Sequence, residues 1–549
     1  MEKTRAEQII DLWKGLKGER SNFESYWQSL HDYYYIEAED INRAYYPGTE
    51  LTVSSLYDST SLEAADVLAS GFMNYLTPPT SKWFSLRSRN PELRDNRRVT
   101  SYLEDVAEQV NYSLNRSNFY NQIVASYKSS GVYGTSAMLE EDDDNDDIRF
   151  FSIPIKSVCL VEDSRGKVCK YIYEYEFTAF QAVDKFGEDN VSREIKEEFT
   201  RNVGSNKKHP FLLFVADRYR RDINKTDKKN MPIEAVWVDV GGKMVVEESG
   251  YHEFPSMCHR FDKRPFIPWG YSPAMKALPF ARILNAVAKT NLRSMMKHTD
   301  PPIAVPDDAF VMPLDANPRA INYYNPKVIQ DARSSIFSFG NTGDPNVGMM
   351  AIQYYQQKVK SMMFNDTFLA FDNITKQMNN PEVMERINEK MTMLGPAVGR
   401  YISEMINPII VRTIGILYRK NKLPMPPDEM IMDPGYEIDC ISQLAQSQRR
   451  SELNALTNGL ALVGQMAQYA PEVLDNIDSD KVVEEAWGIM GAPSRVMRDD
   501  EGIKILRDER GRVAQMNMAM NMAKQGADAA EVGSKVEKNM AEVQEKNSQ

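Results

Sequence analysis

The sequence predicts an α+β protein, and three features of the residue pattern support this prediction. Apolar residues recur every three or four positions over 4–36 and 59–76, as they do in amphipathic helices. From 135 to 262 the period changes to two, which is typical of antiparallel strands. From Ser272 onwards, two long helical patterns enclose a proline-rich stretch. Helices and an antiparallel sheet in separate parts of one chain define the α+β class.

The part of the chain before residue 135 is predicted to be mainly helical. Thr77-Pro78-Pro79 ends the second helix, and Gly131 and Gly134 close the last one. The expected elements are helices over 4–36, 59–76, 96–115 and 119–130, and a strand over 83–87 that contains Trp83.

The period-two region is predicted to form an antiparallel β-domain. Asp239-Val-Gly-Gly242 has the composition of a hairpin turn. A helix is expected over 178–187, and the polar stretch 188–209 is expected to be a loop. The predicted strands are 135–140, 148–153, 157–161, 168–176, 211–219, 233–238 and 243–248.

The stretch from Ser272 to Arg419 organises the rest of the chain. Ser272-Pro273 is an N-cap with proline at the first helical position, and this helix should end near Thr299 before Asp300-Pro301-Pro302. Further on, a second helix over 349–371, a polar break over 372–380 and a helix from 381 to about 420, interrupted at Gly395-Pro396 and Pro408, are expected. After a strand over 436–440, helices over 446–468, 471–476 and 480–490 precede a charged tail, helix-prone or disordered, that begins near 499.

Composition narrows the possible functions. The chain has 549 residues and a net charge of −12, which argues against a conventional basic DNA-binding protein but allows DNA to pass without being gripped. Its four cysteines form no CxxC pair, which favours a reducing compartment. No signal-peptide core is visible, and no run approaches the ~20 apolar residues that span a membrane.

A search for catalytic motifs finds none, so we expect no catalytic residue, cofactor or metal ion. Cys258-His259 would point to opposite faces of a strand, and we interpret them as structural. The acidic run over 140–147 has two interpretations: a solvated hairpin tip, which we favour, or a divalent-cation site of a metal-dependent nuclease.

Basic residues follow one side of the first long helix. They are Arg282, Lys289, Arg293 and Lys297. They either solvate an exposed face or pair with neighbouring carboxylates, or they lie close to DNA. Lys376, in the polar break, is similarly either an ordinary loop lysine or part of a functional loop.

The order of these elements resembles the portal, or head-to-tail connector, of short-tailed phages of the T7-like group. Three stretches carry the resemblance: the helix from Ser59 with the following Pro78–Leu86 segment, the turn from Ser130 to Met138, and Pro265–Pro273 leading into the first long helix. The resemblance covers roughly residues 5–490. It does not account for the acidic run or for the tail.

This resemblance implies a domain layout. Residues 1–271 would form a wing of helices and antiparallel sheet, with 381–440 as its long helix and return strand. The remaining parts would be stem helices at 272–299 and 349–371, a small clip domain at 300–348, a tunnel loop at 372–380, a helical crown at 441–498 and the tail at 499–549.

The resemblance also implies a function and partners. Members form twelve-fold rings around a double-stranded DNA channel at one capsid vertex, and they meet the terminase motor, tail adaptor and tail tube proteins, and the capsid and scaffolding proteins. Assembly would occur in the host cytoplasm, without a membrane partner. The tunnel loop candidates are Asn373, Thr375, Lys376, Gln377 and Asn379, and the clip docking candidates are Asp307, Asp308, Arg319, Tyr323 and Tyr324. The alternative is another ring-forming virion connector or adaptor.

Overall fold

The computed structural model divides the chain into two compact units. The first comprises residues 1–85, 106–424 and 438–446, and the second comprises 86–105, 425–437 and 447–549. The residues that the structure describes are 3–38, 40–42, 56–94, 96–202, 204–222, 224–225, 227–299, 303–304, 327, 337–338, 345–369, 394–432, 435–440, 443–467, 469, 472, 477–490, 497–498, 502–520, 535–536, 538 and 540.

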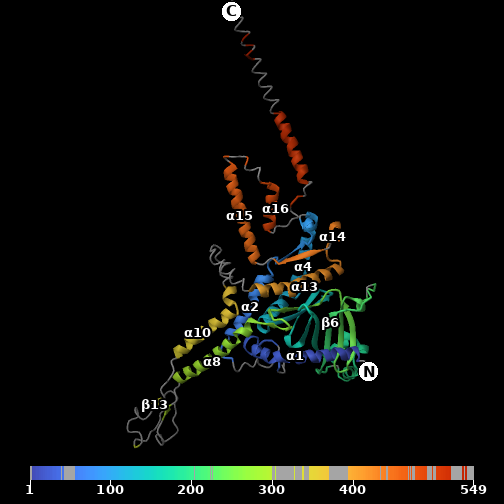
Figure 1. Ribbon diagram of the computed structural model, residues 1–549, viewed down its shortest axis with the longest axis vertical. Coiled ribbons are helices and arrows are strands. Elements are labelled where there is room, and N and C mark those ends of the chain that lie inside the picture. The colour runs from blue at the N-terminus through green and yellow to red at the C-terminus, as the bar shows by residue number, and fades with distance from the viewer. Residues whose placement is uncertain are drawn as a thin grey trace, which may run out of the picture. The chain divides into compact units, whose positions relative to one another are not determined.

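The larger sheet of the first unit is an antiparallel meander of five strands in sequence order. α1 (Arg5–Tyr34) lies along one face of it (Figure 1), where Ile9 packs in a core with Leu212 and Phe214. Side chains alternate between the faces of a strand, so Phe211 points the other way and packs against Phe186 of α6 (Ala179–Phe186). The strands are β4 (Val158–Glu162), β5 (Val168–Thr178), β6 (Lys208–Asp217), β7 (Ile233–Asp239) and β8 (Met244–Tyr251).

A second, three-stranded sheet has the order β3-β2-β9. Its strands are β2 (Thr135–Asp143), β3 (Asp147–Ile153) and β9 (Ser256–Arg260). α5 (Phe119–Tyr133) leads into β2 through Gly134, whose φ of 83° is a left-handed conformation that glycine tolerates. α2 (Thr60–Leu76) packs on α5, with the rings of Phe72 and Tyr127 stacked 5.8 Å apart. These helices give the sheet a buried face.

The remaining elements are short strands and further helices. β10 (Asp262–Lys263) pairs with β11 (Gly270–Tyr271), and β12 (Ile303–Ala304) pairs with β13 (Phe337–Ser338). In the second unit the Arg507 guanidinium pairs with Asp480 at 2.5 Å, which joins the helix over 502–520 to α16 (Ser479–Met490). The others are β1 (Phe84–Ser88), β14 (Tyr436–Cys440), α3 (Pro91–Arg94), α4 (Arg97–Arg116), α7 (Arg193–Arg201), α14 (Asp428–Met432), α15 (Gln443–Ala467) and α16 (Ser479–Met490), with 3-10 turns at Ile155–Ser157, Glu188–Asn190 and Lys228–Asn230.

Most predicted helices and strands are confirmed within the described residues, with three main exceptions. The stretch 188–209 is not a loop, because it contains α7, a polar surface helix of which only Ile195 is buried. β9 was not among the predicted strands, although Cys258 and His259 were expected to lie on a strand; all five of its residues are buried, so it lacks the alternation that reveals a strand. The second long helix is α10 (Pro345–Met362), so it begins four residues earlier and ends nine residues earlier than predicted.

Candidate channel helices and their supports

The two long helices that flank the proline-rich stretch pack against each other. α8 (Pro273–Thr299) continues through Pro279, and α10 lies beside it (Figure 1). Near the start of α10, Gly348 faces the buried side chain of Asn291 late in α8, so the helices are antiparallel. A side chain at residue 348 would overlap Asn291. Glycine therefore permits the close approach of the two backbones.

The pair leaves much apolar surface uncovered. Met296 is 59 % exposed, Met350 70 % and Tyr354 61 %. Other exposed apolar side chains of the pair are Ile283, Leu292, Met295, Val347 and Met349. So many exposed apolar side chains on two neighbouring helices indicate a surface that a partner covers.

The predicted basic stripe lies on α8. Arg282, Arg293 and Lys297 are exposed, and within the described part of the chain none of the three forms an ion pair. Lys289 is half-buried, with Nζ 5.2 Å from the centre of the Tyr57 ring. At 3.6 residues per turn the four positions fall within about 80° of the helix circumference and span roughly 22 Å along it. The stripe can therefore follow a polyanion along the helix.

The other predicted site residues lie outside the described part of the chain, so their arrangement stays a prediction. These are the tunnel loop candidates Asn373, Thr375, Lys376, Gln377 and Asn379 and the clip candidates Asp307, Asp308, Arg319, Tyr323 and Tyr324.

The segment that leads from α10 toward residues 372–380 is anchored. Phe364 has a φ of 59°, which ends the helix, and a short helical turn follows. Phe368 in that turn is buried against Phe72, with ring centres 5.4 Å apart. Gly71 of α2 leaves the notch that the Phe368 ring fills. The sequence pattern did not indicate this anchor, because Gly71 looked like an ordinary helix position.

The helix over 394–419 contains a π-helical segment, Ile402–Ile406, immediately before α13 (Asn407–Arg419). Pro408 cannot donate a hydrogen bond to the carbonyl of Glu404, and a wider turn accommodates this loss. The interruption predicted at Pro408 is thus a π-helical segment. Gly395-Pro396 lies in the first turn of the described helix, and the residues before Leu394 are outside the described part of the chain, so the interruption expected there stays a prediction.

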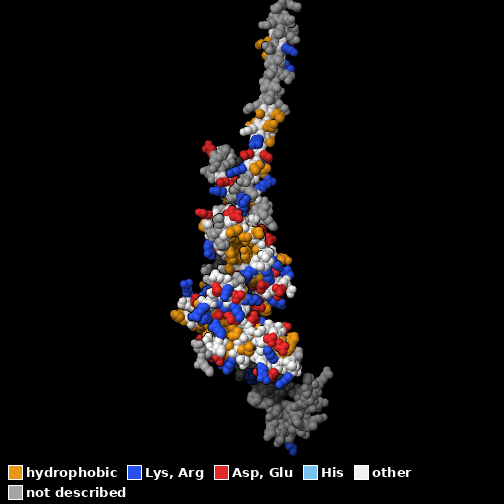
Figure 2. All heavy atoms as spheres, turned by 90° about the vertical axis from the view of Figure 1, so that its right-hand side faces the viewer, with side chains coloured by type: hydrophobic (Ala, Val, Ile, Leu, Met, Phe, Trp, Pro, Cys, Tyr) orange, Lys and Arg blue, Asp and Glu red, His pale blue; other side chains and the backbone are white. Residues whose placement is uncertain are grey.

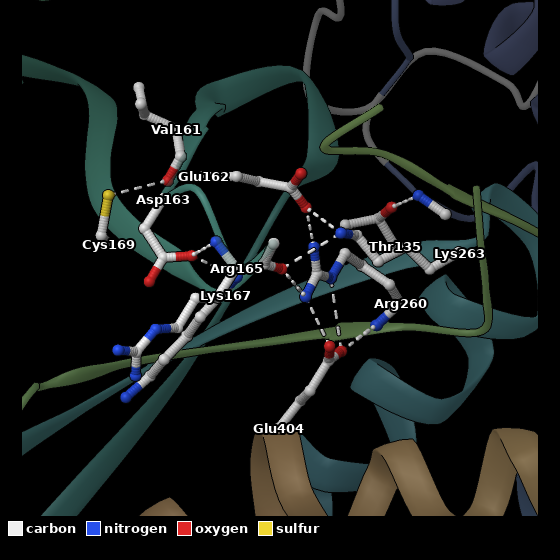
Figure 3. Close-up of polar contacts among 12 residues, drawn as sticks. Thr135, Val161, Glu162, Asp163, Arg165, Lys167, Cys169, Arg260, Lys263 and Glu404 are labelled. Atoms are coloured by element: carbon white, nitrogen blue, oxygen red, sulfur yellow. Dashed lines mark hydrogen bonds and ion pairs between the residues drawn. The ribbon is translucent and has the colours of Figure 1, made fainter. Parts of the chain in front are cut away.

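A buried arginine holds this π-helical segment in place (Figure 3). Arg260, 2 % exposed, contacts the carboxylates of both Glu162 and Glu404. Its backbone N–H donates to Glu404 at 3.0 Å, and its guanidinium donates to the carbonyl of Gly166 at 3.1 Å. Lys263 adds a second positive charge, 2.9 Å from Glu162. The cluster ties the β4–β5 turn, the end of β9 and the long helix together.

The acidic run over 140–147 forms the end of the β2–β3 hairpin. Lys420 Nζ donates to the backbone carbonyl of Asp147 at 3.1 Å, and Lys422 pairs with the Asp147 carboxylate at 2.5 Å. The expected hairpin is confirmed. The expectation that the whole run is solvated was wrong, because Glu140 and Asp147 are 0 % and 3 % exposed.

Glu140 is the unusual member of the run. Its Oε1 accepts a hydrogen bond from Thr413 at 2.8 Å, while Oε2 has no partner among the described residues. Burial disfavours the charged carboxylate and raises the pKa of Glu140 to about 8, although Arg412 and Thr413 oppose this shift. Glu140 is therefore largely protonated at neutral pH.

Two features are absent from the described part of the chain. Among its residues, no three His, Cys, Asp or Glu side chains are placed to hold a metal ion together. Within the same residues, no helix combines the length and the apolar character needed to cross a bilayer. On the face shown in Figure 2, basic and acidic side chains are interspersed and do not gather in one patch.

Comparison with known proteins places the chain in a family. Residues 6–497 match the family model described as bacteriophage head to tail connecting protein. The chain is 32 % identical over 543 residues to the portal protein of Salmonella phage epsilon15, covering 96 % of this chain and 95 % of that one. It is 27 % identical over 543 residues to the probable portal protein of Bordetella phage BPP-1, covering 97 % and 96 %. The chain therefore belongs to the family of bacteriophage head to tail connecting proteins.

Proposed function

We propose that this chain is a phage portal protein, whose copies form a ring at one vertex of the head. Double-stranded DNA would enter the head through the ring during packaging and leave through it at ejection. The observation that carries this proposal is the match to two proteins described as portals over at least 95 % of the chain lengths. The chain is accordingly a structural component of the virion and not an enzyme.

The exposed apolar surface of α8 and α10 supports assembly into a ring. Identical subunits close a ring when two different surfaces of each copy meet. Burying side chains such as Met350 and Tyr354 between copies would remove this surface from water. We propose twelve copies, as the resemblance implies.

The charge balance suggests how DNA could move through such a ring. Twelve copies at −12 each would carry about −144 charges, which disfavours tight static binding of a polyanion. Phosphate contacts then depend on local basic residues. We propose that Arg282, Lys289, Arg293, Lys297 and Lys376 supply them.

The parts of the chain are assigned by the same proposal. The five-stranded sheet and its helices belong to a wing (1–271, with 381–440), and α8 and α10 are the stem helices. The rest comprises the clip at 300–348, the tunnel loop at 372–380, the crown at 441–498 and the tail at 499–549. The clip would meet the terminase motor and then the tail adaptor and tail tube proteins. The wing and crown would meet capsid and scaffolding proteins, with assembly in the host cytoplasm.

Imaging the purified protein by negative stain, together with mass determination of the particles, tests this function. Rings of about twelve subunits with a central hole wide enough for duplex DNA are expected. A protein that stays monomeric, or forms small closed oligomers, at high concentration would contradict the portal function.

A further inference from the structure

The hairpin that leads into α8 is firmly anchored at its base. β10 pairs with β11 through Asp262↔Tyr271 and Lys263↔Gly270. Trp269 is 4 % exposed and packs edge-on against Trp27 of α1, with ring centres 4.9 Å apart. These contacts leave little freedom to the residues between the two strands.

The tip of this hairpin is a tight turn in a strained conformation. Arg264, Pro265, Phe266 and Ile267 form the turn, in which the Ile267 N–H donates to the Arg264 carbonyl at 3.4 Å. Phe266 has a φ of 61°. The position after a turn proline that requires positive φ normally carries glycine or asparagine, because a side chain there is strained. The local backbone conformation alone would therefore not favour phenylalanine at this position.

The phenyl ring gains nothing from the subunit in return for this strain. Phe266 is 99 % exposed, the highest value of the large hydrophobic side chains described. The Arg264 guanidinium lies 3.8 Å from the centre of the Tyr271 ring, so the side chain next to Pro265 folds back on the hairpin while Phe266 projects from it. Strained residues that the surrounding structure holds in place are commonly functional.

We infer that Phe266 is a preformed anchor that inserts into a neighbouring copy of this chain in the ring. This inference rests on the proposed portal function. β11 continues through Ser272 directly into α8, so Phe266 is held at the base of the helix whose exposed apolar side chains we assign to the contact between copies. A rigid, exposed aromatic side chain is the type of residue that dominates interface energies, since little conformational freedom is lost on binding. DNA is a poor candidate for the partner of Phe266, because the phenyl ring offers no charge or hydrogen bond to phosphate.

Two substitutions separate strain from contact. Phe266→Gly removes the ring and relieves the backbone strain, whereas Phe266→Ala removes the ring and keeps the strain. Tyr219→Ala is the matched control, because Tyr219 is 85 % exposed and is not among the residues with positive φ. The full-length proteins are compared by sedimentation over a concentration series, which gives the concentration at half assembly. Thermal unfolding of the unassembled protein gives the stability of the subunit.

Both Phe266 variants should need about tenfold or more protein for half assembly, as expected for loss of an interface anchor. Phe266→Gly should unfold at the same or a higher temperature than the unsubstituted subunit, so a folding defect cannot explain its weaker assembly. Tyr219→Ala should change neither quantity.

Three outcomes would overturn parts of this assignment. If both Phe266 variants form rings as stable as those of the unsubstituted protein, Phe266 does not contact a second copy. If the rings of these variants are stable but fail to be incorporated into phage heads, the partner of Phe266 is another virion protein. If the unsubstituted protein itself forms no rings, the portal function fails before the role of Phe266 is reached.

Discussion

Replacing Glu140 with glutamine tests whether a protonated carboxyl group is buried under α13. The carboxyl group is 0 % exposed, and burial raises its pKa from the ordinary 4.5 to about 8. At a pH between these two pKa values, the Glu140 carboxyl group keeps its proton in the folded chain and has lost it in the unfolded chain. The stability that the protonated Glu140 carboxyl group allows is therefore fully present below pH 4.5 and is lost as the pH rises toward 8.

The size of this effect follows from the two pKa values. Each pH unit between them corresponds to about 1.4 kcal/mol, so the full loss is roughly 5 kcal/mol and the loss at pH 7 roughly 3 kcal/mol, both as upper limits. Glutamine keeps the shape and an oxygen for the Thr413 hydroxyl but does not ionise in either state. Glu140→Gln should accordingly gain stability over the unsubstituted chain as the pH rises from 5 to 8.

Urea unfolding of both full-length proteins, followed by tryptophan fluorescence at pH 5, 6, 7 and 8, measures this difference. Asp144→Asn is the control, because it removes an acidic charge from an exposed position of the same hairpin and should add no such pH dependence. A difference between Glu140→Gln and the unsubstituted chain that stays constant over this range would refute the reasoning. It would mean that the Glu140 carboxyl ionises at its ordinary pKa.

Three further predictions concern the channel and its supports. Lys376→Ala should leave ring assembly intact and reduce DNA packaging or retention; particles with a normal DNA content would contradict this. Arg260→Ala should lower the free energy of unfolding by about 3 kcal/mol at most, because the partly buried carboxylates of Glu162 and Glu404 lose a buried partner. A double-mutant cycle with Glu404→Gln should show coupling, and strict additivity would argue against the cluster. Gly71→Ala should destabilise the protein by about 1–3 kcal/mol, because the added methyl group would overlap the Phe368 ring; thermal unfolding measures this loss. Gly15→Ala, which meets open space, should instead be neutral or stabilising.

The sequence predicted the elements whose side chains follow a clear period. α1, α2, α6 and α8 appeared within about two residues of their expected bounds, because each buries one stripe and exposes the other. α7 was missed because a polar surface helix has almost no apolar stripe. The end of α10 was misplaced because Phe364 and Phe368 continue the helical apolar pattern while the backbone at Phe364 turns to positive φ.

The functional hypothesis also came from the sequence, through the order of its elements, and the family match supports it. The positions of the basic residues on α8 followed from helical spacing alone. Which of them are exposed did not, since the half-burial of Lys289 depends on Tyr57, more than two hundred residues away.

By itself, the sequence determined what depends on neighbours along the chain: helix starts at caps and prolines, strand alternation, and the helices on either side of the proline-rich stretch. Only the tertiary structure decided which groups meet across long separations. Arg260 and Glu404 meet at a π-helical segment, and Thr413 covers Glu140. The strained turn at Phe266 and its exposed ring are also visible only there. The physical reason is that burial, pKa and backbone strain at these residues are set by contacts between distant segments, which local spacing does not encode.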